Sequence, residues 1–128
     1  MNDADPGAAG ASASALVARL DSAVAAARGD AAAYFDLEAG LVLGASAWPG
    51  LPQEALDALC RAAPPLLEGA EGGSALIASG LEMVVLQRLA GEDATALCLV
   101  LDPETPPEEA RAAAARAAQA MAPAGEAA

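Results

Sequence analysis

The sequence predicts a single α+β domain built on a central five-stranded antiparallel sheet. Three observations lead to this fold class. An acidic turn with a glycine, Glu38-Ala39-Gly40, separates two short apolar runs, which is typical of a hairpin. Three more apolar runs follow one another between residues 74 and 101 with short links, so neighbouring strands should run antiparallel. Helical patterns stand before, between and after these groups. The predicted order is α-β-β-α-β-β-β-α, and 128 residues suffice for one domain.

The first helix is expected to start at a serine cap, Ser12 or Ser14, and to run to about Arg28, with Gly29 as its stop. Residues 1–11 are rich in Gly, Ala, Asp and Pro and are expected to be a disordered tail. The domain is therefore predicted to span residues 12–122. The apolar positions of this first helix recur at helical spacing, which indicates an amphipathic helix lying on the rest of the fold: Leu16, Leu20, Val24 and Ala27.

The hairpin strands are predicted at about 31–36 and 41–45. Gly40 can supply the positive φ that a tight turn needs, while Asp36 and Glu38 keep the turn in water. Both strands are apolar nearly throughout instead of alternating. A half-solvated strand would alternate, so these strands are expected to be covered on both faces.

The second helix is predicted to follow the loop Trp48-Pro49-Gly50-Leu51, with Pro52 in its first turn. Its inward residues are Leu56, Leu59, Cys60 and Ala63. Pro64-Pro65 should end or kink this helix, because proline lacks the N–H that the helix needs, and a short turn through Leu66 and Leu67 should follow.

Three strands are predicted next, at about 74–79, 82–89 and 95–101, again apolar on both faces. The last helix should open with the capping box Thr105-Pro-Pro-Glu108 and run to about Met121, with residues 123–128 fraying. Its inward face is mostly alanine, which favours close packing on a sheet. Three helices of this length cover five strands poorly in one chain, so a partner is expected to complete one layer.

Composition excludes several classes of function. The chain has 18 acidic residues, a formal charge of −12 and arginine as its only basic residue type, so it lacks the clustered cations that bind nucleic acid or anionic membranes. No signal peptide or membrane-spanning run is visible, and a cytoplasmic protein is expected. The lysine-free, Ala-, Gly-, Pro- and Arg-rich composition indicates a GC-rich bacterial genome.

No catalytic centre, metal site or cofactor is predicted. Histidine is absent, and two isolated cysteines, Cys60 and Cys98, are expected to be free buried thiols. The glycine-rich link Gly69-Ala-Glu-Gly-Gly-Ser74 lacks the lysine and spacing of a phosphate-binding loop. The serines lack a nucleophile elbow and a histidine partner.

The element order and the phrase Ala33-Tyr-Phe-Asp-Leu-Glu-Ala-Gly-Leu-Val-Leu-Gly-Ala-Ser46 resemble the roadblock (dynein light chain) family, in its bacterial MglB-like type. The likeness extends from about Leu16 to Met121, and the Leu97–Asp102 strand before an acidic helix start is its second most specific part. The resemblance implies a roadblock/profilin-like fold. It also implies a homodimer in which third strands meet edge to edge in one continuous sheet and second helices lie side by side.

Members of this family in bacteria and archaea act with small Ras-like GTPases or as scaffolds with other roadblock-like proteins, so the resemblance implies a non-enzymatic regulator or scaffold of this kind. When the dimer of the family is transferred to this sequence, the resemblance implies a sheet junction made of Ala75, Leu76, Ile77, Ala78 and Ser79. The partner-binding surface of the helix pair comprises Gln53, Glu54, Asp57, Arg61 and Glu68. The Pro64-Pro65 break departs from the long regular second helix of the family.

Three single residues have two interpretations each. Arg61 and Arg88 could each contact a GTPase or a phosphate, or they could form ion pairs within this acidic chain. Trp48 could be an exposed anchor, since tryptophan is enriched at binding hot spots, or it could pack against the second helix. The alternative functions are a small-molecule sensor, which needs a roomy pocket between sheet and helix, and an acidic chaperone or adaptor that binds another protein without a GTPase.

Overall fold

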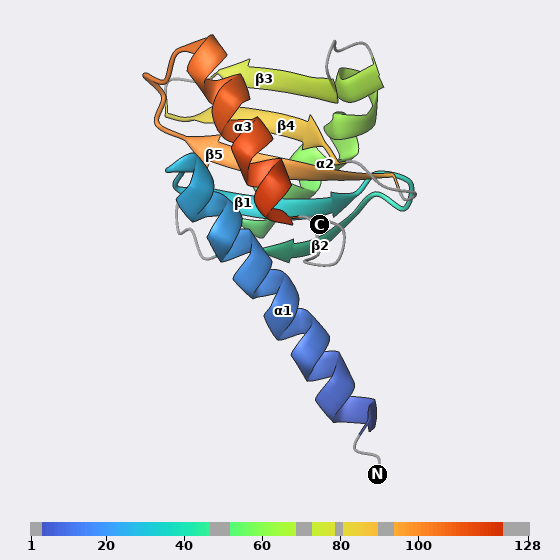
Figure 1. Ribbon diagram of the computed structural model, residues 1–128. Helices are drawn as coiled ribbons and strands as arrows, with labels where there is room; N and C mark the ends of the chain where they lie inside the picture. Colours follow the sequence, from blue (N-terminus) through green and yellow to red (C-terminus); the bar gives the residue numbers. More distant parts are fainter. Residues whose placement is uncertain (1–3, 47–51, 69–72, 79–80, 90–93, 122–128) are drawn as a thin grey trace.

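The computed structural model describes residues 4–46, 52–68, 73–78, 81–89 and 94–121 (Figure 1). Three helices and five strands follow one another in the predicted order. Their bounds are α1 Ala4–Ala27, β1 Ala31–Asp36, β2 Leu41–Ala45, α2 Gln53–Glu68, β3 Ser74–Ala78, β4 Met83–Arg88, β5 Thr95–Leu101 and α3 Pro107–Met121. The α+β class predicted from the sequence is confirmed.

The five strands form one antiparallel sheet in the order β2-β1-β5-β4-β3. The pairs β1–β2, β3–β4 and β4–β5 join neighbours in the chain, whereas β1 pairs with the distant β5, for example Ala33 with Cys98. This pairing places β5 at the centre, where all seven of its residues are buried. The two edges of the sheet are therefore β2 and β3.

Helices cover both faces of the sheet (Figure 1). On one face α1 contacts β1 and β2, while α3 contacts β3, β4 and β5; on the other face α2 crosses the strands. Two apolar cores result. The first is centred on Leu20, Val85 and Leu99, and the second on Phe35, Cys60 and Leu86. The inward face of α3 is mostly alanine, as predicted: Ala110, Ala113, Ala114, Ala117 and Met121.

The hairpin turn between β1 and β2 forms as predicted. Gly40 has a φ of 71°, and its N–H donates to the carbonyl of Asp36 at 2.9 Å. The Asp36 carboxylate accepts from the backbone N–H groups of Glu38 and Ala39 at 3.0 and 2.9 Å. A carboxylate that bonds the backbone two and three residues later is the usual reason why aspartate opens such turns.

The start of the first helix is corrected. α1 begins at Ala4, ahead of the predicted cap at Ser12 or Ser14, so residues 4–11 are helical in the structure although the sequence suggested a disordered tail. The segment is rich in alanine, the strongest helix former, and Pro6 falls in the first turn, where its missing N–H has no intrahelical partner to lose.

The end of α1 is near the predicted position, but a different residue makes the turn. Arg28, not Gly29, adopts the left-handed conformation, with a φ of 55°. The N–H of Gly29 donates to Val24 and that of Arg28 to Ala25, the two bonds of a Schellman cap. Gly29 lies in a tight space, since a Cβ there would lie 3.1 Å from the Val100 carbonyl oxygen.

The second helix does not end at its prolines. α2 continues through Pro64 and Pro65 to Glu68, so of the two predicted outcomes, an end or a kink, the helix does not end there. The two prolines remove the N–H groups that would bond the carbonyls of Cys60 and Arg61. Burial of Leu67 outweighs the loss of these two hydrogen bonds, because it adds one more turn to the buried apolar face of α2: Leu56, Cys60, Ala63 and Leu67.

The edge strand β2 is not covered on both faces, contrary to the prediction. Leu41 is 57% exposed and Leu43 is 45% exposed. The register steps from Tyr34↔Gly44 to Phe35↔Val42, so Leu43 is the extra residue of a β-bulge. An apolar sequence alone cannot distinguish an edge strand from a central one.

The strand and helix bounds near the other end of the chain shift slightly. β3 ends at Ala78, and Ser79 lies outside the described residues. α3 begins at Pro107, and the Pro106 carbonyl accepts the N–H of Ala110 at 2.8 Å. Pro106 is therefore the N-cap in place of Thr105, whose hydroxyl donates to the Asp102 carbonyl at 2.7 Å in the preceding turn.

Candidate partner-binding surface

The predicted sheet junction lies on an edge strand. Residues 75–78 belong to β3, which pairs with β4 on one side. The register from Ser74↔Gln87 to Ala78↔Met83 is continuous, without a bulge. The strand sequence Ser-Ala-Leu-Ile-Ala contains no charge and no proline. Charges, prolines and bulges are the usual protection of an edge strand. β3 is therefore the less protected edge, and β2, which has a bulge, is the more protected one.

A contact that the sequence did not reveal anchors the start of β3. Nη1 of Arg111 in α3 donates to Oγ of Ser74 at 2.6 Å and to the Ser74 carbonyl at 3.3 Å. Ser74 is buried although it is polar, and this bond satisfies its hydroxyl. The sequence separation of 37 residues explains why no local pattern could have found the pair.

The outer face of α2 carries the predicted partner residues. Glu54, Arg61 and Glu68 are exposed and stand seven residues apart, so they form one line along the helix. Gln53 is exposed and Asp57 half-buried; they lie one turn apart on the flank of this line, and Nε2 of Gln53 donates to Oδ1 of Asp57 at 3.0 Å. The helix thus brings all five residues onto one polar side.

Arg61 is the only cation of α2. Within the described part of the chain its guanidinium makes no hydrogen bond or ion pair, so the intramolecular pair weighed for it is not seen there. The acidic Glu54 and Glu68 lie two turns away on either side. An exposed arginine without a partner is available to an oxygen acceptor on another molecule.

The opposite flank of the same exposed face is apolar. Leu66 is 41% exposed, and further apolar residues accompany it along the helix: Ala55, Ala58, Leu59, Ala62 and Pro65. Leu66 follows the two prolines, where an end or a kink of the helix was predicted, so the sequence did not assign it to a surface. α2 crosses the sheet and contacts β3 as well as β2, β1 and β4, so the helix that carries this apolar flank reaches the edge strand β3 (Figure 1).

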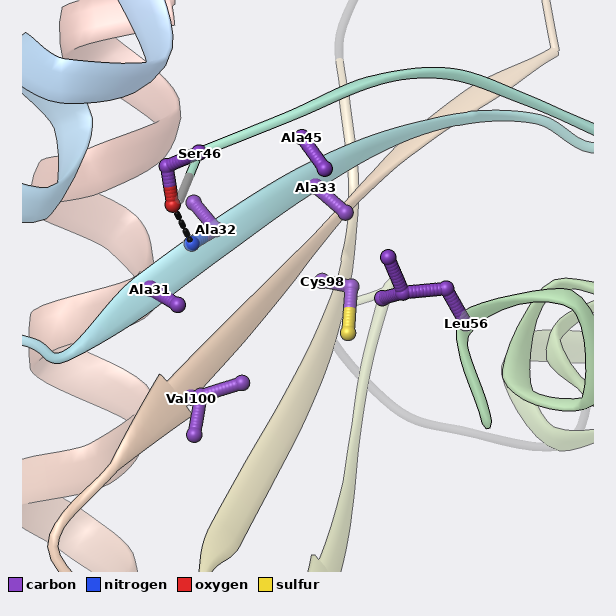
Figure 2. A pocket seen from close by; sticks show the side chains of 8 residues that line it. All are labelled: Ala31, Ala32, Ala33, Ala45, Ser46, Leu56, Cys98 and Val100. Carbon is purple, nitrogen blue, oxygen red and sulfur yellow. Dashed lines mark hydrogen bonds between the residues drawn. The ribbon is translucent and has the colours of Figure 1, made fainter. Parts of the chain in front are cut away.

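The interior offers little space for a ligand on the α2 side. A hollow of about 10 Å³ lies between β1, the end of β2, β5 and α2 (Figure 2). Oγ of Ser46 accepts the N–H of Ala32 at 2.9 Å, and Leu56 and Cys98 also line the hollow (Figure 2). This volume is close to that of one water molecule. Among the described residues on the α2 side, this hollow is too small for the ligand that the sensor hypothesis needs.

Both cysteines are free and buried, as predicted. Burial raises the pKa of the Cys98 thiol to about 12, and the neighbouring Cys60 and Glu82 contribute to this rise. Burial, followed by the nearby Asp57, also raises the pKa of Cys60. The thiolate is the reactive form of cysteine, so these thiols are inert at neutral pH.

Two other properties concern the described residues alone. Among them, no group of three or more metal-ligating side chains comes together. No described helix is both long and apolar enough for a bilayer crossing. Trp48, weighed above as an anchor, lies outside the described part of the chain.

Comparison with known proteins finds similar structures without similar sequences. No family model and no curated protein matches the chain. Myxococcus xanthus MglB superposes with a TM-score of 0.64 at 11% identity, over 84% of this chain and 85% of that one. A structure described as MglB with a tetrameric arrangement gives 0.59 at 21% identity, over 85% and 86%. The gliding protein MglB of Thermus thermophilus gives 0.58 at 20% identity, over 85% and 87%.

Three independent features of the chain agree with these superpositions: the element order, the antiparallel sheet order with β2 and β3 at its edges, and helices on both faces. The resemblance noted for residues 33–46 is thereby confirmed at the level of the fold. The chain has the roadblock fold in the form found in MglB structures.

Proposed function

We propose that this protein is a cytoplasmic, non-enzymatic homodimer that regulates a small Ras-like GTPase or serves as a scaffold in its signalling complex. One observation carries the proposal: α2, whose outer face has an exposed apolar flank, contacts β3, the edge strand without a bulge, charge or proline among its described residues. An open edge and an apolar helix flank are what two copies would bury together when their sheets join.

In such a dimer the β3 strands of two copies pair edge to edge and the α2 helices lie side by side. Pairing satisfies the outer backbone N–H and C=O groups of residues 75–78, and helix contact removes Leu66 from water. The polar line of Glu54, Arg61 and Glu68 then remains on the surface as a double row. We assign the GTPase-binding role to this row, with Arg61 as its cation.

The dimer is tested by placing a charge on the apolar flank. Ala58 is exposed on α2, so Ala58→Glu leaves the monomer fold intact while it buries a charge in the proposed helix pair. Ala112→Glu is the matched control, since Ala112 is exposed on α3 on the other face of the sheet. In sedimentation equilibrium we expect dimers for the wild type and the control, and monomers for Ala58→Glu. A monomeric wild type at micromolar concentration contradicts the dimer.

The partner role is tested with the Ras-like GTPase encoded nearest to the gene. We expect the protein alone to hydrolyse no GTP and to change the hydrolysis rate of that GTPase when the two are mixed. Arg61→Ala should abolish the change and leave the dimer mass unaltered. Binding without any rate change would identify a scaffold or adaptor, and absence of binding would overturn the GTPase proposal.

A further inference from the structure

A second surface lies on the other face of the sheet, away from α2. A groove of about 580 Å³ opens between the end of α1, the end of β5 and the segment of α3 from Glu109 to Arg116. Leu101 lines it, together with the polar residues Arg28, Thr105, Glu109 and Arg116. This volume falls within the range of small-molecule sites, in contrast to the single-water hollow on the α2 side.

Arg116 is held in place by a contact with the neighbouring helix. Its Nε donates to the carbonyl of Ala26 at 3.0 Å, which satisfies a carbonyl at the C-terminal end of α1. The contact fixes the guanidinium at the wall of the groove. Its Nη groups have no partner among the described residues, so they remain as oriented donors.

Arg28 reaches the same groove from a backbone conformation that is unfavourable for arginine. It occupies the left-handed position of the α1 cap, where glycine is the usual residue. Steric crowding of Cβ makes this conformation costly for any residue except glycine. Its side chain makes no hydrogen bond or ion pair within the described part of the chain. A strained residue that carries an unpaired charge at the wall of a groove points to a role for that charge.

We propose that this groove binds a small phosphate monoester. Two guanidinium groups from different elements match the double charge of a phosphate monoester, and arginine is the residue best suited to its oxygens. The Glu109 carboxylate, which forms no ion pair with either arginine in the described structure, accepts a hydroxyl or amino donor from the rest of the ligand. The inference is independent of the proposed dimer, because α2 and the β3 edge contribute nothing to the groove.

The experiment is an NMR titration of the full chain with glucose 6-phosphate and with guanosine monophosphate, each paired with its unphosphorylated parent. We expect the phosphate monoesters to shift the backbone amides of Arg28, Ala113 and Arg116, and the parent compounds to shift none of them. One monoester should bind more tightly than inorganic phosphate, because Glu109 contacts the rest of the ligand.

Arg28→Gly is the decisive variant because it separates binding from folding. Glycine relieves the strain at this position, so the variant should melt at a higher temperature and yet lose at least about tenfold in affinity. Arg88→Gln removes one exposed charge outside the groove and should bind as the wild type does. The proposal is overturned if no monoester shifts the groove amides at millimolar concentration, if Arg28→Gly binds normally, or if Arg88→Gln weakens binding equally.

Discussion

The buried thiol of Cys98 makes the stability of this fold sensitive to alkaline pH. Its ordinary pKa of 9.0 applies to the unfolded chain, and burial raises the value in the folded chain to about 12. Below pH 9 the thiol is protonated in both states, so the folded state keeps its full stability. Above pH 9 the unfolded chain gains free energy by releasing the proton, whereas the folded chain does not. Stability is therefore lost progressively as the pH rises from 9 towards 12.

The magnitude follows from these two values. At about pH 10 the unfolded thiol is one unit above its pKa, which lowers the free energy of unfolding by about 1.4 kcal/mol. The assay is urea unfolding followed by circular dichroism at pH 7 and pH 10, for the wild type and for Cys98→Ala. All other ionisable residues are common to both proteins. Between pH 7 and pH 10 the free energy of unfolding should fall by about 1.4 kcal/mol more in the wild type than in the variant.

The variant also provides its own control. At pH 7 Cys98→Ala should be less stable by about 1 kcal/mol, because it removes one heavy atom from a packed core. That difference should shrink or reverse at pH 10. Equal losses in both proteins between the two pH values would refute the reasoning, since Cys98 would then titrate alike in the folded and unfolded chains.

Three further predictions concern stability. Leu20→Ala should lower the free energy of unfolding by about 2–5 kcal/mol, because Leu20 is 0% exposed. Val17→Ala on the same helix is the control, since the Val17 side chain is 43% exposed. In urea unfolding this control should lose far less stability. Arg111→Ala should cost about 1 kcal/mol by leaving the buried hydroxyl of Ser74 without its donor, and faster amide exchange in β3 should accompany the loss. Pro65→Ala should stabilise the protein by about 1–3 kcal/mol, since it restores a helical N–H in α2; an unchanged melting temperature would contradict this account of the proline.

Local sequence determined the elements themselves. The bounds of β1, β2 and β5 agree with the apolar runs, because turn residues such as Gly40 interrupt those runs and fix where a strand must stop. The exposed line of Glu54, Arg61 and Glu68 follows directly from helical spacing. The partner role of that line and the dimer junction at β3 stay predictions, since a single chain contains neither interface.

Features that depend on distant contacts were beyond the sequence. Local propensity predicted that Pro64-Pro65 would end or kink α2, but the helix continues to Glu68, with Leu67 buried in the second core. Local propensity also predicted Gly29 as the stop of α1, but Arg28 adopts the left-handed conformation and Gly29 lies in a tight space against the Val100 carbonyl. In both cases packing free energy exceeds a local backbone cost.

The sequence by itself therefore determined the order of helices and strands, the buried face of each helix and the absence of histidine chemistry. Only the tertiary structure decided which strands became edges, because β1 pairs with β5 across about half of the chain. It also brought Arg28 and Arg116 to one groove. Strand pairing and side-chain convergence are set by contacts between residues far apart in the chain, and local periodicity carries no information about such contacts.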